Sequence, residues 1–282
     1  MTLAPDPTDA RDPTARVAGL FDALSSTYDA VGVDFFGPIA DGLLAAMPPR
    51  AGERWLDVGC GRGAVLLPAA QAVGPEGRAV GVDIAPGMVE QARRLAAERG
   101  LDHVEVVVGD ATAPPVTGPF DAVTSSLVLF FLPDPGAALR SWVPLMAAGA
   151  RLGVVTFGPV DPRWASVDDV FAPYLPPALP DARTSGATGP FGSDEAMEAL
   201  VTDSGYVDVR TVTRDLPVRF ADAEQWHAWT WSIGQRAMWL AVPPEQRPDV
   251  LAAAQQRLAS YAEPDGSITF VQNVRYTLAS RG

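Results

Sequence analysis

The sequence contains no lysine, and this absence narrows the chemistry that the chain can perform. All 21 basic residues among its 282 are arginine. A protein without lysine cannot form the lysine Schiff base of pyridoxal-phosphate enzymes, and it cannot supply the lysine of a phosphate-binding P-loop. Both classes of enzyme are therefore excluded.

Cysteine and histidine are almost as scarce. Cys60 is the only cysteine, so the chain has neither a disulfide of its own nor a cysteine-clustered metal site. This usage fits a reducing compartment, and we expect a cytoplasmic protein. The two histidines, His103 and His227, form no pattern typical of a Cys-His catalytic pair with Cys60.

The chain also lacks an excess of positive charge and long apolar runs. The formal net charge of -13 disfavours binding to the phosphates of DNA or RNA. No stretch approaches the roughly 20 apolar residues that a membrane span needs. Residues 1–13 contain Asp and Pro but no apolar signal-peptide core, and we expect them to form a disordered tail. A small molecule is therefore the expected partner, and a homodimer stays open.

What the chain does contain is a glycine-rich turn between an apolar strand and a helix. Residues 56–63 read Leu-Asp-Val-Gly-Cys-Gly-Arg-Gly, and a second predicted strand ends on Asp83, twenty residues after Gly63. Bare backbone lets a ligand come close, and a carboxylate at the next strand end can hold ribose hydroxyls. The pattern predicts a nucleotide-type site whose glycine spacing differs from the G-x-G-x-x-G of dinucleotide-binding enzymes.

Four segments in this order resemble the class I S-adenosylmethionine (SAM)-dependent methyltransferases. Residues 57–63 look like the first motif of that family, and residues 82–84 look like its second. Residues 109–111 resemble the adenine-side motif, and residues 120–126 resemble the fourth strand and its mouth. The agreement covers roughly residues 20–157 and is strongest with small-molecule enzymes of the quinone-biosynthesis C-methyltransferase type.

Alternating strands and helices indicate the fold class. The expected strands are 54–58, 79–83, 104–108, 121–127 and 151–157, and the helices between them are 63–73, 88–99 and 137–146. This alternation is typical of a parallel sheet with helices on both faces. The resemblance implies an α/β, doubly wound, mostly parallel seven-stranded sheet, the Rossmann-like methyltransferase fold. The apolar run 104–108 is expected to be a buried central strand.

The expected organisation adds an N-terminal helical segment and a helical cap to this sheet. Helices at 14–26 and 36–47 complete a SAM-binding core over residues 14–157. Residues 158–192 and 222–262 are expected to form a lid over the acceptor site. Residues 193–221 and 263–282 then complete the core sheet, as strands 206–220 and 268–278 of a hairpin that the helices 222–241 and 244–262 interrupt.

The resemblance implies a set of cofactor-binding residues. Asp57 would orient the glycine loop and the ammonium end of SAM, Asp83 would hold the ribose, and Asp110 would accept the adenine amino group. Arg62 either faces the methionine carboxylate or is solvated, and for Met88 an adenine wall and plain helix packing are both open. The remaining members are Tyr28, Gly59, Cys60, Gly61, Gly63, Ile84, Ala111 and Ser126.

Catalytic and acceptor-binding residues are less clearly marked. Many members of the family carry histidines after the fourth strand, where this chain reads Leu-Val-Leu-Phe-Phe-Leu at 127–132. His227 is then the candidate general base, with a packed lid histidine as the alternative. Phe131, Trp226 and Trp229 are candidates for an aromatic acceptor site, although Trp226 equally fits a buried helix stripe with Ile233, Ala237 and Leu240.

Charged residues in the expected cap suggest two further hypotheses. Arg163, Arg183 and Arg236 are candidates for binding an anionic acceptor. Asp168 and Asp169 are interpreted as solvated loop acids, because the acidic ligands of metal-dependent catechol methyltransferases lie elsewhere. No metal is therefore expected.

The sequence as a whole predicts metal-independent, SAM-dependent methyl transfer to carbon or oxygen of a small, apolar or aromatic metabolite. A SAM-binding cyclase or pericyclase of the same fold, without net methyl transfer, is the alternative. The absent dinucleotide fingerprint disfavours a third hypothesis, an NAD-dependent oxidoreductase. The intact cofactor motifs disfavour a fourth, a noncatalytic binding module.

Overall fold

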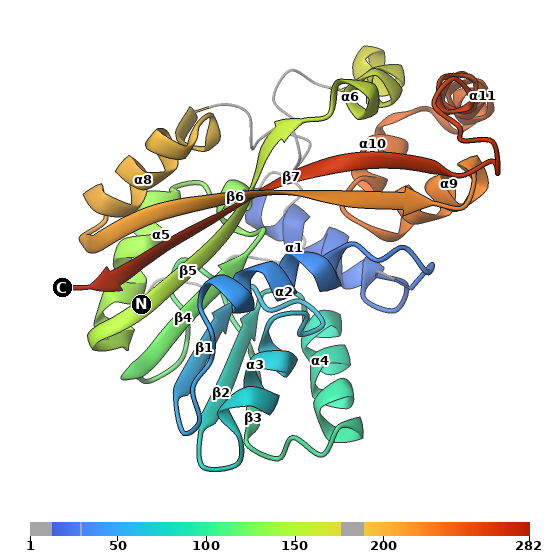
Figure 1. Ribbon diagram of the computed structural model, residues 1–282. Coiled ribbons are helices and arrows are strands. Elements are labelled where there is room, and N and C mark those ends of the chain that lie inside the picture. Colours follow the sequence, from blue (N-terminus) through green and yellow to red (C-terminus); the bar gives the residue numbers. More distant parts are fainter. Residues whose placement is uncertain (1–12, 29, 176–188) are drawn as a thin grey trace.

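A twisted sheet forms the centre of the computed structural model, which describes residues 13–28, 30–175 and 189–282. In these residues seven strands are ordered β3-β2-β1-β4-β5-β7-β6 (Figure 1). Neighbours among the first five are parallel, and β7 is antiparallel to both β5 and β6. The strands are β1 (Arg54–Val58), β2 (Arg78–Asp83), β3 (Val104–Val108), β4 (Phe120–Ser126), β5 (Met146–Val160), β6 (Tyr206–Phe220) and β7 (Ile268–Arg281). The expected fold class is confirmed.

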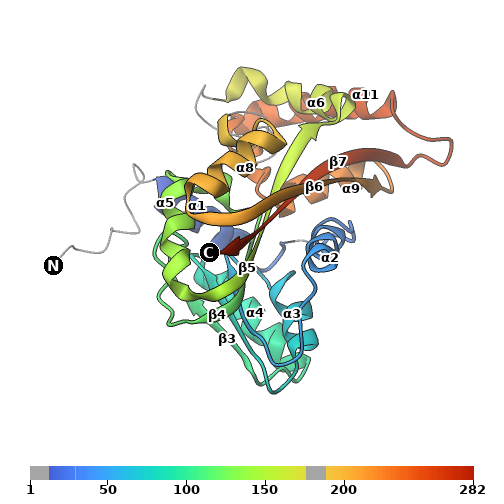
Figure 2. The same cartoon turned by 60° about the vertical axis from the view of Figure 1, so that its left-hand side comes forward.

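Helices cover both faces of this sheet. Figure 2 shows α2 (Phe36–Ala46) and α3 (Leu66–Val73) on one side, with α5 (Pro135–Trp142) and α8 (Asp194–Asp203) on the other. Helix α4 (Pro86–Glu98) follows β2 and packs against β2 and β3. Each expected helix of the core is therefore present, with its ends shifted by a few residues.

Local sequence signals explain where several helices begin. The side chains of Asp134, Ser193 and Asp222 accept hydrogen bonds from backbone N–H groups three residues later, at 2.8, 3.1 and 2.7 Å. Such side chains satisfy N–H groups that the first helical turn leaves without a partner, and each contributes about 1 kcal/mol. They fix the starts of α5, α8 and α9 (Ala223–Ser232).

The prediction of a buried central strand at 104–108 is wrong. β3 lies at the edge of the sheet, only Val106 within it is buried, and the Val108 side chain is 48% exposed. Valine favours the extended backbone of any strand, so an apolar run does not by itself distinguish a central strand from an edge strand.

A cap of helices lies at the ends of β5, β6 and β7 that extend beyond the rest of the sheet. β5, for example, runs five residues beyond its last pairing with β4 (Figures 1 and 2). The described part of the cap consists of α6 (Pro162–Asp168), η3 (Asp169–Tyr174), α9, α10 (Arg236–Ala241), η5 (Pro244–Gln246) and α11 (Arg247–Ala259). Ile233 and Gly234 divide the single helix expected at 222–241 into α9 and α10.

The N-terminal segment closes the side of the molecule next to α4. Helix α1 (Pro13–Leu24) packs on α4, where Leu24, Ala85 and Met88 form a small buried cluster. Residues 1–12 of the expected tail and residues 176–188 of the expected lid lie outside the described residues. Among the described helices, none combines the length and apolarity needed to cross a membrane.

Candidate functional site

A cavity of about 550 Å³ lies at the carboxyl ends of β1, β2 and β4, the position at which open α/β sheets bind ligands. Every cofactor-binding residue expected from the sequence lines it, and so does Phe131. The cavity also contacts α1, α2, the end of β5 and the link between α9 and α10. The core and the cap therefore share one cavity.

The glycine loop after β1 has a backbone that only glycine adopts readily. Gly59, Gly61 and Gly63 have φ values of +73, +53 and +91°. A Cβ at Gly59 would lie 2.3 Å from the Val128 side chain, whereas a Cβ at Gly61 would have no described heavy atom within 4 Å. Gly59 thus permits tight packing against the loop after β4, and Gly61 leaves bare backbone facing open space.

Asp83 ends β2 and anchors this loop. Its Oδ2 accepts a hydrogen bond from Gly61 N at 2.8 Å, and its Oδ1 accepts one from Ala85 N at 2.9 Å. Burial raises the pKa of its carboxyl group. A carboxylate offers about four lone pairs, so both oxygens keep capacity to accept hydrogen bonds from two ligand hydroxyls.

Asp57 is buried beside Asp83. Its Oδ1 accepts a hydrogen bond from Thr124 Oγ1 at 2.8 Å, and Thr124 Oγ1 in turn accepts one from Trp55 Nε1 at 3.0 Å. Burial raises the pKa of Asp57 to about 7, and the charge of Asp83 adds to this shift. Two desolvated carboxyl groups lining one cavity favour a ligand that carries positive charge.

Arg62 connects the glycine loop to the N-terminal segment. Its Nη1 donates to the carbonyl oxygen of Tyr28, and the Tyr28 ring stacks on Phe36 at 4.9 Å. Its Nε is buried and has no hydrogen-bond partner among the described residues. Arg62 as a whole is partly exposed, so both alternatives stay open, and the free Nε donor suits a ligand carboxylate.

The adenine side of the predicted site lies at the end of β3. Asp110 Oδ1 accepts a hydrogen bond from Thr112 N at 2.8 Å, and Trp142 Nε1 donates to the carbonyl oxygen of Ala111 at 2.7 Å. Met88 lines the cavity and packs in the α1–α4 cluster, so its helix packing is confirmed and its role as an adenine wall stays a prediction. These donors, acceptors and buried carboxyl groups fit SAM, which has a ribose, an amino-purine, a carboxylate and cationic groups.

Cys60 lies between two of the glycines but is not placed for nucleophilic chemistry. The side chain is 5% exposed, and burial raises the pKa of its thiol. A thiol that resists ionisation is a poor nucleophile. What Cys60 can offer the site is therefore the backbone of the glycine loop.

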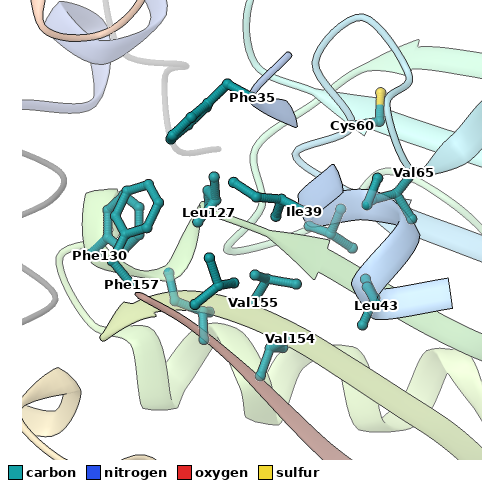
Figure 3. Close-up of a cluster of buried hydrophobic side chains, with 14 of the residues drawn as sticks. Phe35, Ile39, Leu43, Cys60, Val65, Leu127, Phe130, Val154, Val155 and Phe157 are labelled. Carbon is teal, nitrogen blue, oxygen red and sulfur yellow. The ribbon is translucent and has the colours of Figure 1, made fainter. Parts of the chain in front are cut away.

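The other half of the cavity is aromatic. Phe130, in the 3-10 turn η1 (Leu129–Phe131), stacks on Phe157 of β5 at 5.7 Å, and Phe131 meets Phe21 of α1 edge to face at 5.4 Å. Figure 3 shows Phe130 and Phe157 side by side, with Phe35 and Leu127 near them and Cys60 on the separate glycine loop. Phe35, Phe36 and Phe157 line the cavity too, although sequence reasoning missed them.

The backbone turns abruptly where β4 leads into this aromatic wall. Leu127 has a φ of +60°, and its N–H donates to the carbonyl oxygen of Val155 at 2.9 Å. A left-handed leucine costs about 1–2 kcal/mol and persists only where the surroundings fix it. The turn brings Ser126 and Leu127 to the cavity between the glycine loop and the phenylalanines.

Neither Trp226 nor Trp229 belongs to the described lining of the cavity. Both indoles are fully buried, and Trp229 packs against Phe35, Phe220 and Trp164 at 5.1, 5.2 and 5.7 Å. These positions support packing rather than an acceptor site, but the expected continuous stripe is wrong, because the helix is interrupted at residues 233–235 and Leu240 is 52% exposed. Of the three ring partners of Trp229, Phe35 is the one that lines the cavity.

His227 faces another part of the cap. Its Nε2 accepts a hydrogen bond from Trp231 Nε1 at 2.9 Å, and its ring lies 4.9 Å from that of Trp239. Burial lowers the pKa of His227. It is absent from the described cavity lining, so this position supports the packed lid histidine.

The charged cap residues have local partners instead. Arg163 pairs with Asp161 at 2.7 Å, and Arg236 lies over the Trp231 ring at 5.8 Å. Neither belongs to the described cavity lining, and Arg183 lies outside the described residues. Asp168 is not a solvated loop acid, because it ends α6 and accepts a hydrogen bond from Gln235 Nε2 at 2.7 Å. Within the described ranges, no cluster of His, Cys, Asp and Glu could hold a metal.

Comparisons with known proteins agree with this geometry. A family model described as a methyltransferase domain matches residues 56–149. Nocamycin O-methyltransferase of Saccharothrix syringae is 41% identical over 271 residues, which cover 91% of this chain and 95% of that protein. Aklanonic acid methyltransferase of Streptomyces sp. (strain C5) is 42% identical over 165 residues, which cover 58% of this chain and 75% of that protein.

Solved structures share the fold at lower identity. The YcgJ protein of Bacillus subtilis has a TM-score of 0.55 at 18% identity, covering 87% of this chain and 97% of its own. The [4+2]-cyclase SpnF has a TM-score of 0.57 at 17% identity, and the match covers 96% of this chain and 98% of that protein. These likenesses show the same architecture in a protein of unstated activity and in a cyclase.

Proposed function

The chain belongs to the SAM-dependent methyltransferases, and on that premise we propose that it methylates an oxygen atom of a small, apolar or aromatic acceptor. One observation carries the proposal. The aromatic wall and the glycine loop line the same cavity, so an apolar acceptor can lie next to the cofactor without crossing polar surface. The described aromatic residues of that wall are Phe21, Tyr28, Phe35, Phe36, Phe130, Phe131 and Phe157.

The residues of the chain bind and orient the two reactants in this proposal. SAM, when bound, supplies an electrophilic methyl group on a positively charged sulfur. Asp83 holds the ribose, Arg62 Nε pairs with the carboxylate, and the ionised Asp57 balances positive charge. The phenylalanines exclude water from the acceptor, and orientation of this kind provides much of the acceleration in a bimolecular displacement.

The cavity imposes a requirement on the acceptor. Its described lining contains no histidine. Of its four carboxyl groups, those at 57, 83 and 110 lie on the cofactor side, and the fourth, Asp41 of α2, is exposed to solvent. A hydroxyl that ionises readily by itself, such as a phenol or an enol, needs no strong base from the protein. We therefore propose an acidic hydroxyl as the methylated group.

Oxygen is favoured over carbon by the relatives. The protein that is 41% identical over nearly the whole chain is named an O-methyltransferase. The cyclase alternative has less support, because the likeness to SpnF at 17% identity concerns the fold alone. The net charge of -13 argues against a nucleic-acid partner, and cytoplasmic location and a homodimer stay predictions.

A methyl-transfer assay tests the proposal. The purified protein is titrated with SAM in a calorimeter. It is then incubated with SAM carrying a trideuterated methyl group and a panel of acceptors that includes aklanonic acid and phenols such as 2-naphthol. We expect saturable SAM binding, release of S-adenosylhomocysteine, and a product whose label is lost by ether cleavage. SAM binding with labelled carbon–methyl product would contradict the choice of oxygen, and turnover only with non-aromatic polar acceptors would contradict the aromatic class.

A further inference from the structure

One amide oxygen lies at the cap side of the cavity without a partner. Gln235 immediately precedes α10, lines the cavity and is only 4% exposed. Its Nε2 donates to Asp168 Oδ1 at 2.7 Å, whereas its Oε1 is buried and accepts no hydrogen bond from any described residue. Buried polar atoms are nearly always satisfied, so an orphaned acceptor in a residue that lines a cavity points to a donor that the described residues do not supply.

The orientation of this amide is fixed by its partner. An ionised carboxylate has acceptors only, so the NH₂ group of Gln235 must face Asp168. The Oε1 atom therefore has to point away from Asp168, and the usual ambiguity between the two ends of a glutamine amide does not apply here. Because Asp168 ends α6 and Gln235 lies just before α10, two separate parts of the cap hold the acceptor in place.

The link that carries Gln235 belongs to the aromatic half of the cavity. Ile233 and Gly234 line the cavity beside it, and a Cβ at Gly234 would lie 3.8 Å from Phe21. Phe21 itself packs edge to face on Phe131. Gln235 thus adds a hydrogen-bond acceptor to the part of the lining that Phe21, Phe131 and Ile233 form.

We propose that Gln235 is an acceptor-binding residue whose Oε1 takes a hydrogen bond from a hydroxyl or N–H group of the methyl acceptor. The inference rests on the proposed function and narrows its substrate class to ring-bearing, apolar molecules with a hydrogen-bond donor. An analogue without the donor leaves Oε1 buried and unpaired, and a site of this kind rejects such an analogue strongly. The donor would also fix how the ring lies against the phenylalanines.

Matched probes test the proposal without requiring catalysis. Binding of 2-naphthol, which has a donor, and of 2-methoxynaphthalene, which has none, is measured by calorimetry with saturating S-adenosylhomocysteine present. We expect wild-type protein to bind 2-naphthol at least about tenfold more tightly, and Gln235→Leu to bring the ratio of the two dissociation constants close to one. Gln272→Leu is the control, because Gln272 is also buried, donates to Asn273 O at 3.0 Å and is absent from the described lining.

The outcomes separate this inference from the proposed function. The role of Gln235 is overturned by any of three results. These are a ratio of the two dissociation constants near one in the wild type, the same ratio in Gln235→Leu as in the wild type, or no binding of either probe. Gln235→Met replaces the leucine variant if the latter does not fold. If the ratio behaves as expected but no phenol is methylated, the aromatic O-methylation fails while the Gln235 contact stands. Unchanged affinity of both variants for S-adenosylhomocysteine shows that the cofactor half is intact.

Discussion

The two halves of the cavity are built in different ways. The cofactor half consists of backbone N–H groups, three left-handed glycines and carboxylates at consecutive strand ends, all within residues 57–126. The acceptor half consists of side chains from α1, the start of α2 with Phe35 before it, η1, β5 and the link before α10. Phe21 and Gln235 within it lie 214 residues apart in the sequence. One half is fixed by the sheet, and the other by packing between distant segments.

This difference explains how one fold accommodates different acceptors. Changing the backbone at a strand end would disturb the sheet, so the cofactor half has little freedom. Replacing a phenylalanine or Gln235 changes the shape and polarity of the acceptor half and leaves the strands in place. Function on a common fold is then set by such side chains rather than by the architecture.

The largest effect is expected where the cap packs behind the acceptor half. Trp229→Ala removes a fully buried indole that contacts Phe35, Phe220 and Trp164. The free energy of unfolding should fall by about 3–5 kcal/mol, as for other buried large-to-small substitutions, and Trp229→Phe should lose less. Urea denaturation measures both. A change below about 1 kcal/mol for the alanine variant would mean that Trp229 is not part of the packed core.

In the cofactor half, the corresponding substitution should affect binding more than folding. Asp83→Ala removes the acceptor for Gly61 N and Ala85 N together with the proposed ribose contact. The dissociation constant of SAM should rise at least about a hundredfold, which corresponds to about 2.8 kcal/mol. Calorimetry gives the constant, and Asp215→Ala on the exposed outer strand β6 is the control. Near wild-type affinity in the Asp83 variant, with a native circular dichroism spectrum, would refute the assignment of the cofactor half.

A pH dependence is a smaller effect that belongs to the cofactor half alone. Burial raises the pKa of Asp57 to about 7, so below that pH the group is protonated in the ligand-free protein. A cationic ligand favours the ionised form, and binding must then release a proton. The dissociation constant of SAM should therefore fall about fivefold from pH 6 to pH 7, as expected for one proton released from a group with a pKa near 7.

The control for this prediction is Asp57→Asn. It cannot ionise, so the affinity of this variant should vary less than twofold over the same interval. Measurements stop at pH 7, because the amino group of SAM starts to lose its own proton near about 7.7–8.0. Ligand-free protein should lose stability as the pH rises from about 4 to 7, since the folded state binds the proton more tightly. An affinity that is constant with pH in the wild type would contradict the buried charge at Asp57.

The sequence predicts far more of the cofactor half of the cavity than of the acceptor half. The glycine loop, Asp83 and Asp110 follow apolar strands directly, so local pattern and strand order suffice to bring them together. Phe35, Phe157 and Gln235 carry no local motif, and only tertiary packing brings them to one cavity. The tryptophans of α9 form a conspicuous cluster, but an indole fits a buried stripe as well as a ligand site. Aromatic composition alone does not distinguish these two roles.

The smallest expected effect concerns His227. If His227 were the general base, the acceptor half of the cavity would depend on a residue outside its described lining. The residue accepts a hydrogen bond from Trp231 and is absent from the described cavity lining. His227→Gln keeps an acceptor for the indole N–H, so kcat with the best phenol of the panel should change less than about twofold, and the pH profile should keep its shape. Chemistry in the acceptor half then depends on the acidity of the substrate hydroxyl. A drop of about a hundredfold in kcat, with loss of a titration near pH 6–7, would instead place a base in the cap and require the cap to move toward the cavity during turnover.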